Sequence, residues 1–377
     1  MLRILKKSVL IIVIISTLAM CSACTSRNES SEITAYTEEQ RRAVEIQESS
    51  IAITEIPNKS AGVYVAEPKS FSKEDIDNFL SYCEDSVAYP QDEVTNTSIK
   101  YYGTCNSGRS FFSLESTGYH PHVVFQYVDQ EKYDTYSAYP IYTGEEAYET
   151  NSQYSVGWMF TEVKDFSFAS EKEAEEYVRA ALSVLGLSDV TLFRTLYIDH
   201  NTMMEAGKKL STDPIYAPIG EKKENNGYPI RNDWSELDDA YMFSFGISVD
   251  NTTLSPRFEI RETATYIGSE IIVWYSASGI DFLSIEMPWD VGELVQEPEP
   301  IVSAEVAMDI AKEKMESILT FNNITYSNAY LEYQYRQDGA NWVVFPVWTI
   351  KVSYQPKDNT SILYTYVSVD AFTGKEL

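Results

Sequence analysis

Cysteine and histidine are the scarce reactive residues of this 377-residue chain, which has four cysteines and three histidines. Cys21 and Cys24 end an apolar stretch at the start of the chain, whereas Cys83 and Cys105 lie in segments with the patterns of folded protein. A thiol can receive a lipid, form a disulfide, bind a metal or attack a substrate, and its surroundings decide which. The two pairs therefore predict different chemistry.

The start of the chain has the three parts of an export signal. Arg3, Lys6 and Lys7 precede an apolar run over residues 9–20, and small residues follow. The run is too short to span a bilayer comfortably as a permanent helix. We therefore expect residues 1–23 to be a signal peptide. The alternatives are an uncleaved anchor helix and a Cys-Ser-Ala-Cys redox pair, although no strand precedes that pair.

The end of this segment resembles the lipobox of bacterial lipoproteins, in which a small residue directly precedes the cysteine that receives diacylglycerol. Cys24 follows the small Ala23. Cys21 follows the bulky Met20, although Leu18 favours it. Because the peptidase must accommodate the side chain before the cut, Cys24 is the expected lipidation site and Cys21 the alternative. The resemblance implies a lipid-anchored protein on the outer face of the cytoplasmic membrane.

The other cysteine pair could form a disulfide, because an exported protein meets oxidising conditions. A bond between Cys83 and Cys105 would contribute about 3 kcal/mol in the chain-entropy model. Two free buried thiols are the alternative. A cysteine nucleophile would need a histidine, and for Cys105 the only candidates are His120 and His122. The His120-Pro121-His122 pair could hold a metal, but no third ligand with suitable spacing follows.

Catalytic motifs are missing from the sequence. It contains no Gly-x-Ser-x-Gly elbow, no His-Glu-x-x-His helix, no phosphate-binding glycine loop and no calcium loop. Glu236 with Asp238 or Asp239 could do acid–base work on glycans, although such pairs are common in an acidic chain. We therefore expect a non-enzymatic protein without metal or cofactor.

Six tryptophans raise the alternative of a sugar-binding surface, since flat aromatic rings stack on sugars. Trp274, Trp342 and Trp348 fall in strand-like runs and are expected in the core. Trp234, in a polar loop, is the best single candidate for an exposed contact, but a half-buried indole with its N–H satisfied is the role we expect.

Composition limits the partners. Asp and Glu number 57 against 29 Lys and Arg, which gives a net charge of −28. Such a charge repels phosphate backbones, so nucleic acid is excluded as an expected partner. At 44% hydrophobic residues the chain can bury substantial cores in two or three domains.

Helices and strands are predicted from periodicity and caps. Ser72, Ser170 and Ser303 each precede an amphipathic helical stretch. Loops are expected at 132–155 and 216–233. Strands are expected at 98–103, 110–115, 122–128, 156–163, 190–198, 240–249, 269–276, 279–286, 325–335, 341–354 and 361–370.

This order predicts an α+β fold made of repeated units, each with one helix packed on an antiparallel sheet. The best predicted boundary is Gln296-Glu297-Pro298-Glu299-Pro300, which is typical of an extended linker. The predicted divisions are a signal peptide at 1–23, a polar tether with a short helix near Thr37 at 24–60, an N-terminal α+β region at 61–165, a middle helix-plus-sheet unit at 166–290, a Glu/Pro linker at 291–302 and a C-terminal unit at 303–377.

The C-terminal unit resembles a PepSY module, a small exported α+β unit of bacterial propeptides and lipoproteins. The resemblance rests on Ser303-Ala304-Glu305 before an Ala-rich helix, on Pro346-Val347-Trp348, and on the closing Val369-Asp370-Ala371-Phe372-Thr373-Gly374-Lys375. Residues 170–286 follow the same plan of a Ser-capped helix and long strands. This similarity predicts an internal duplication.

The architecture is also similar to the membrane-tethered regulators that restrain cell-wall sensor kinases outside Gram-positive cells. It differs in lacking a retained transmembrane helix. The resemblance implies a binding or regulatory role toward a protein, peptide or cell-wall partner. Two alternatives remain: a cell-wall glycan or peptide hydrolase with unidentified carboxylates, and a solute-binding lipoprotein, which would need a βαβ alternation.

Overall fold

The computed structural model describes the chain in ranges separated by gaps. The chain divides into two compact units, Met1–Ala43 and Val44–Leu377, and every described residue lies in the second. Cys21, Cys24, His120 and the helix expected near Thr37 lie outside the described residues. The described residues are 46–47, 52–53, 60–116, 122–139, 141, 155–213, 216, 231–250, 252–257, 259–260, 265–266, 268–318, 321–356 and 363–377.

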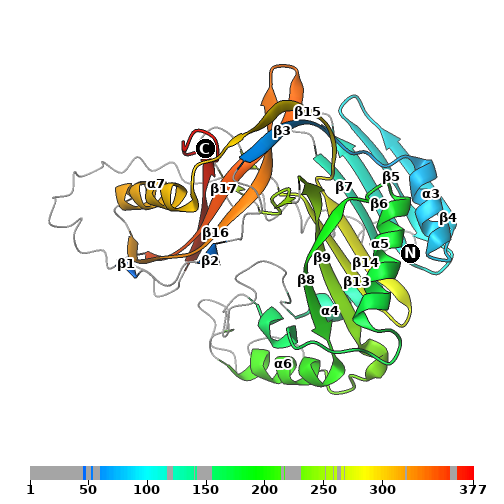
Figure 1. The fold of residues 1–377 in the computed structure, drawn as a ribbon. Helices are drawn as coiled ribbons and strands as arrows, with labels where there is room; N and C mark the ends of the chain where they lie inside the picture. Colours follow the sequence, from blue (N-terminus) through cyan, green and yellow to red (C-terminus); the bar gives the residue numbers. More distant parts are fainter. Residues whose placement is uncertain are drawn as a thin grey trace. The chain divides into compact units, whose positions relative to one another are not determined.

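The fold is α+β, as predicted, and its sheets are mostly antiparallel (Figure 1). The larger sheet has nine strands within the described ranges, in the order β10-β9-β13-β14-β7-β6-β5-β4, with β8 also paired to β9. These strands are β4 (Val87–Val94), β5 (Ser98–Cys105), β6 (Ser110–Ser116), β7 (His122–Val128), β8 (Val190–Ile198), β9 (Ala240–Val249), β10 (Thr252–Thr253), β13 (Glu270–Ser276) and β14 (Gly279–Glu286). A separate two-stranded sheet is formed by β11 (Glu259–Ile260) and β12 (Thr265–Tyr266).

Helices cover both faces of the larger sheet, and alternate residues of each strand point to opposite faces. On β9, Phe243 packs in one core with α3 (Lys73–Tyr82) and α5 (Glu171–Val184). Its neighbour Met242 packs in a second core with α4 (Gln130–Ser137), α6 (His200–Thr212) and the 3₁₀ turn η2 (Gly157–Phe160). This second core supports the candidate site.

The smaller sheet has seven strands within the described ranges. The order is β1-β16-β17-β3-β15, while β18 pairs with β17 and β2 with β16. Helix α7 (Ala304–Ser317) packs Ala307, Ala311 and Met315 against this sheet. The strands are β1 (Ile46–Gln47), β2 (Ala52–Ile53), β3 (Ser60–Pro68), β15 (Trp289–Pro300), β16 (Phe321–Asp338), β17 (Asn341–Pro356) and β18 (Leu363–Asp370).

The three predicted helix starts are confirmed. Ser72 and Ser170 each form a capping box, and the Ser303 side chain accepts from the backbone N–H of Val306. These side chains satisfy backbone donors that a helix leaves unpaired. Gly186, which follows the end of α5, has a positive φ of 74°, a conformation that glycine adopts readily.

Several segments differ from their sequence-based predictions. Residues 156–163 do not form the expected strand but contain the 3₁₀ turn η2. The expected loop at 132–155 begins within helix α4, and helix α6 was not predicted. Strands β3 and β4 also escaped prediction; β4 is largely exposed at the sheet edge, so it lacks a clear alternating pattern.

The predicted linker is part of a strand. Residues up to Pro300 extend β15, which pairs with β3 across three register shifts. Because β15 lies at the sheet edge, its prolines interrupt no second ladder. The predicted boundary between 61–165 and 166–290 does not divide the fold into separate sheets, because β7 of the first region pairs with β14 of the second.

Pro346 lies within β17, a strand that has partners on both sides. On one side it pairs with β16 throughout, and on the other its partner changes from β3 at Val344 to β18 at Val347. Pro346 lies at this change of partner, where its missing N–H interrupts no regular pairing on that side.

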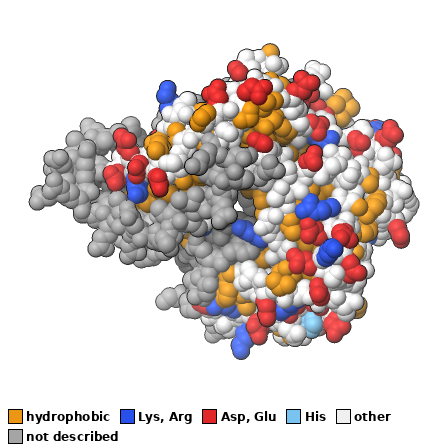
Figure 2. Space-filling model, in the orientation of Figure 1, with side chains coloured by type: hydrophobic (Ala, Val, Ile, Leu, Met, Phe, Trp, Pro, Cys, Tyr) orange, Lys and Arg blue, Asp and Glu red, His pale blue; other side chains and the backbone are white. Residues whose placement is uncertain are grey.

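Within the described residues, no helix has the length and apolarity needed to cross a membrane. Acidic side chains are spread over the face drawn in Figure 2 rather than gathered in one patch. This spread is expected of a solvated acidic surface.

Candidate functional site

Helix α4 forms one wall of the candidate site. Asp129 caps its first turn, because its side chain accepts from the backbone N–H of Lys132 at 3.2 Å. Tyr136, on the buried face, donates from its hydroxyl to the carbonyl oxygen of Asp238 at 2.6 Å. Burial of Tyr136 holds the opposite face, with Glu131 and Asp134, toward solvent.

The segment from Arg231 to Asp238 forms the other wall. The Arg231 guanidinium pairs with Asp233 at 2.7 Å and with Asp238 at 3.1 and 3.3 Å. Its central carbon lies 4.3 Å from the centre of the Trp234 ring. Asp238 also accepts from the backbone N–H of Ser235 at 2.9 Å. These contacts hold Arg231 and Trp234 in one arrangement.

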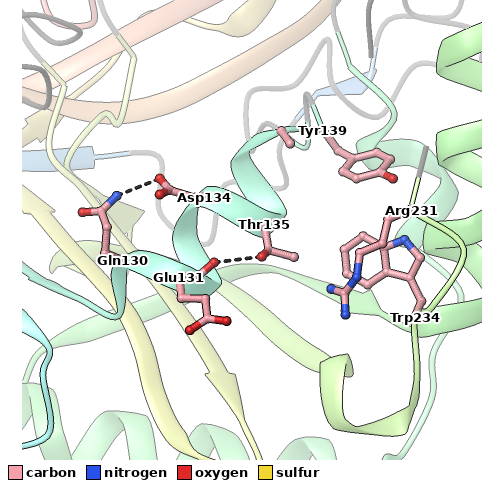
Figure 3. A pocket seen from close by; sticks show the side chains of 8 residues that line it. Gln130, Glu131, Asp134, Thr135, Tyr139, Arg231 and Trp234 are labelled. Carbon is pink, nitrogen blue, oxygen red and sulfur yellow. Dashed lines mark hydrogen bonds between the residues drawn. The ribbon is translucent and has the colours of Figure 1, made fainter. Parts of the chain in front are cut away.

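A cavity of about 600 Å³ lies between these walls. In Figure 3, Gln130, Glu131 and Asp134 lie on one side, and Arg231, Trp234 and Tyr139 on the other. The volume is within the usual range for small-molecule sites. The lining residues are Gln130, Glu131, Asp134, Thr135, Ala138, Tyr139, Arg231 and Trp234.

The cavity combines carboxylates with aromatic rings. Gln130 donates from its side-chain amide to Asp134 at 2.7 Å, and the Thr135 hydroxyl donates to the backbone carbonyl of Glu131 at 2.8 Å (Figure 3). Among the described residues, one Asp134 oxygen and both oxygens of the Glu131 carboxylate meet no further donor. Groups arranged in this way can orient a polar ligand.

Trp234, the candidate for an exposed contact, is buried, because only 6% of it is accessible to solvent. Its ring stacks with Tyr136 at 6.3 Å and meets the edge of Tyr139 at 5.7 Å. With Arg231 also over the ring, little aromatic surface is left for a sugar. The alternative of an exposed stacking surface at Trp234 gains no support from this arrangement.

The other tryptophans follow their predictions in part. Trp274 and Trp348 are buried in the core, as expected, and Trp342 is half-buried against it. Trp289, which falls outside the predicted strands, is also buried and lies 4.4 Å from the Tyr335 ring, centre to centre.

Two of the three acidic residues proposed for glycan chemistry, Asp238 and Asp239, have structural partners. Asp238 pairs with Arg231, as described above. Asp239 accepts from the backbone N–H of His200 at 2.7 Å and contacts its Nδ1 at 2.9 Å. Burial raises the pKa of Asp239 despite these hydrogen bonds.

Histidine chemistry gains no support from the described residues. His122 lies on β7, and burial lowers the pKa of its imidazole. His200 begins α6, beside Asp239. No group of three or more His, Cys, Asp or Glu side chains suited to a metal occurs within the described ranges.

Cys83 and Cys105 are free thiols in the structure, which agrees with the second of the two alternatives and not with the possible disulfide. Cys83 ends helix α3 and Cys105 ends strand β5, and both pack in or against the first core. Burial raises the pKa of each thiol to about 12. Both are therefore poor nucleophiles at neutral pH.

Sequence reasoning missed the cavity residues of α4. The Tyr-rich stretch suggested a loop, but Asp129 is a good N-cap, and Tyr133 and Tyr136 have helical spacing. Those signals could have revealed the helix. The approach of Arg231 to α4 has no local signal, since about a hundred residues separate them in the chain.

The fold has a counterpart among solved structures. It is similar to an uncharacterized protein from Eubacterium rectale ATCC 33656, with a TM-score of 0.59 over 88% of this chain and 90% of that chain. The two sequences are 16% identical, so this similarity concerns the fold alone. The sequence matches no family model and no curated protein.

Proposed function

We propose that this chain is a lipid-anchored, extracytoplasmic binding protein without enzymatic activity, which acts on a protein, peptide or cell-wall partner through the α4 cavity. One observation carries the proposal. The cavity offers Glu131 and Asp134 to a ligand. The carboxylates of Asp238 and Asp239 are instead bound to Arg231 and His200. This arrangement supports recognition better than acid–base chemistry.

The membrane anchor is supported by the signal-like start of the chain and by Ala23 before Cys24. Anchoring would raise the local concentration of the binding site near its partner, which assists weak binding. Replacing both Cys21 and Cys24 by alanine should move the protein out of the detergent phase in Triton X-114 partitioning. The Cys83→Ala, Cys105→Ala double variant is the matched control and should stay in that phase. Lipid labelling that survives the first pair of changes would contradict the anchor.

A PepSY-like module and an internal duplication are proposed on the basis of strand order. Helix α7 precedes the antiparallel strands β16, β17 and β18, which neighbour one another in that order. Helix α5 precedes β8, β9 and β13, which also neighbour one another in that order. Superposing these two units tests the duplication, and helices on opposite faces of the matched strands would end it.

The binding role is tested by cross-linking and capture from native membranes. The wild-type protein should capture a defined partner. The Glu131→Gln, Asp134→Asn variant should capture much less of that partner. The matched control replaces Glu162 and Glu176, which are 82% and 67% exposed on their side chains, by glutamine. Equal capture by all three proteins would place the binding surface elsewhere.

Cell-wall hydrolysis remains the second candidate, on one observation. Glu270 and Glu286 lie directly opposite each other on β13 and β14, and burial raises the pKa of Glu286. Two neighbouring carboxyl groups with different environments are the usual basis of glycoside hydrolysis. Clearing of purified cell walls by the wild-type protein, but not by Glu286→Gln, would favour this candidate over binding.

A further inference from the structure

We infer that the α4 cavity takes an amine: a ligand with one ammonium group beside a carbonyl oxygen, such as a basic side chain in a peptide. This inference rests on the proposed binding function and names its ligand class. It follows from the charges around the cavity, from one buried donor and from the space between the two walls.

The charge left for a ligand in this cavity is negative. Among the described residues that line it, Arg231 is the only cation, and two carboxylates already hold its guanidinium. Lys132, which follows Glu131 on α4, instead donates to the carbonyl oxygen of Leu237 at 3.0 Å. Within the described part of the chain no lysine or arginine pairs with Glu131 or Asp134, which lie one helical turn apart. An ammonium group is the complement of such a pair.

A buried donor supplies the second feature of the ligand. The indole Nε1–H of Trp234 meets no acceptor among the described residues, although the side chain is almost fully buried in the cavity wall. A buried donor without an acceptor destabilises the folded protein. A ligand oxygen that accepted from this group would recover part of that cost. Because the N–H is screened from solvent, this contact requires a small shift of the side chains around it.

Other ligand classes fit less well. An anion such as phosphate would face Glu131 and Asp134 and would compete with Asp233 and Asp238 for Arg231. A sugar ring would need a bare aromatic face, but Arg231, Tyr136 and Tyr139 already contact the Trp234 ring. A cavity of about 600 Å³ holds an amino acid side chain with its flanking peptide groups.

Nuclear magnetic resonance can test this assignment on the full mature chain. Tryptophan indole N–H signals are few in this protein, and Trp234→Phe identifies the one from Trp234. The probe is Nα-acetyl-lysine amide, which has one ammonium group and two carbonyl groups. The matched neutral probe is Nα-acetyl-norleucine amide, which has a similar length and no charge.

We expect the lysine probe to shift the Trp234 indole signal and to reach saturation. The norleucine probe should bind at least about tenfold more weakly, as should the lysine probe at high salt. The Glu131→Gln, Asp134→Asn variant should bind both probes equally weakly. The Glu162→Gln, Glu176→Gln variant should behave like the wild type. Equal affinity for the two probes, tighter binding of Nα-acetyl-glutamate, or no movement with any probe would overturn the inference.

Membrane capture tests the binding function separately from the ligand class. If membrane capture depends on Glu131 and Asp134 but the lysine probe does not bind, the ligand class is wrong and the binding site stands. If the lysine probe binds but capture does not depend on these residues, the amine site stands and the proposed partner does not use it.

Discussion

Arg231 and Asp238 form a two-point ion pair, with Nη1 3.1 Å from Oδ1 and Nη2 3.3 Å from Oδ2. The pair helps to hold the guanidinium over the Trp234 ring, 4.3 Å from its centre. The pair also joins the start of this segment to the turn at Ser235, which Asp238 caps. One carboxylate thus sets both the charge and the shape of the cavity wall.

Asp238→Asn should destabilise the protein by about 1–2 kcal/mol, because it leaves a hydrogen-bonded partner of Arg231 uncharged. The value is modest, since 34% of the Arg231 side chain is exposed and solvent screens the pair. Urea unfolding measures the change. Asp233→Asn, at the 81% exposed partner of the same arginine, should have a clearly smaller effect. Equal effects of the two changes would show that burial of Asp238 adds nothing.

Asp85 should contribute to acid stability. Burial acts to raise the pKa of its carboxyl group, but hydrogen bonds from Ser107, from the backbone N–H of Ser86 and from the Tyr127 hydroxyl together lower it. A lowered pKa in the folded state stabilises the protein above about pH 4, the usual value for aspartate. That stability is lost as pH falls through the folded pKa.

Tyr127→Phe tests this contribution by removing the donor that lies 2.9 Å from Asp85 Oδ2. It should cost about 1–2 kcal/mol at neutral pH, and the difference from wild type should shrink in acid. Tyr89→Phe, at an exposed position, is the control and should be neutral. A difference that stays constant from neutral pH to pH 2 would show that the Asp85 charge is not involved.

Cys83 and Cys105 should react slowly with iodoacetamide in the native protein. Their pKa values of about 12 leave little thiolate at pH 8, so alkylation should be at least about a hundredfold slower than for an ordinary cysteine. Both should react fully in denaturant without a reductant. Failure to react there would indicate a disulfide, and rapid native labelling would contradict burial.

Ser170→Ala should destabilise the protein by about 1 kcal/mol, because it removes the side chain that caps α5. Thermal unfolding or urea unfolding can measure the loss. Lys172→Ala is the control in the same first turn, where the lysine is 84% exposed. If the two variants have equal stability, the capping box does not hold the helix start.

Much of the α+β fold follows from local pattern. Strands β7, β8, β9 and β14 begin and end at their predicted residues, because alternation and flanking turns specify them. The helix starts at Ser72, Ser170 and Ser303 follow from side chains a few residues away. The predictions failed in segments whose local pattern is weak, such as the exposed strand β4 and the short helix α4.

The sequence alone determined the serine caps, the alternation of most strands and the signal-like start that predicts an anchored protein. Only the tertiary structure decided that Arg231 lies beside α4, that Trp234 is buried, and that the proline-rich segment before Pro300 pairs with β3. These are contacts between distant parts of the chain, and neither periodicity nor spacing specifies them. The cavity exists because a helix and a turn far apart in sequence pack on the same face of one sheet.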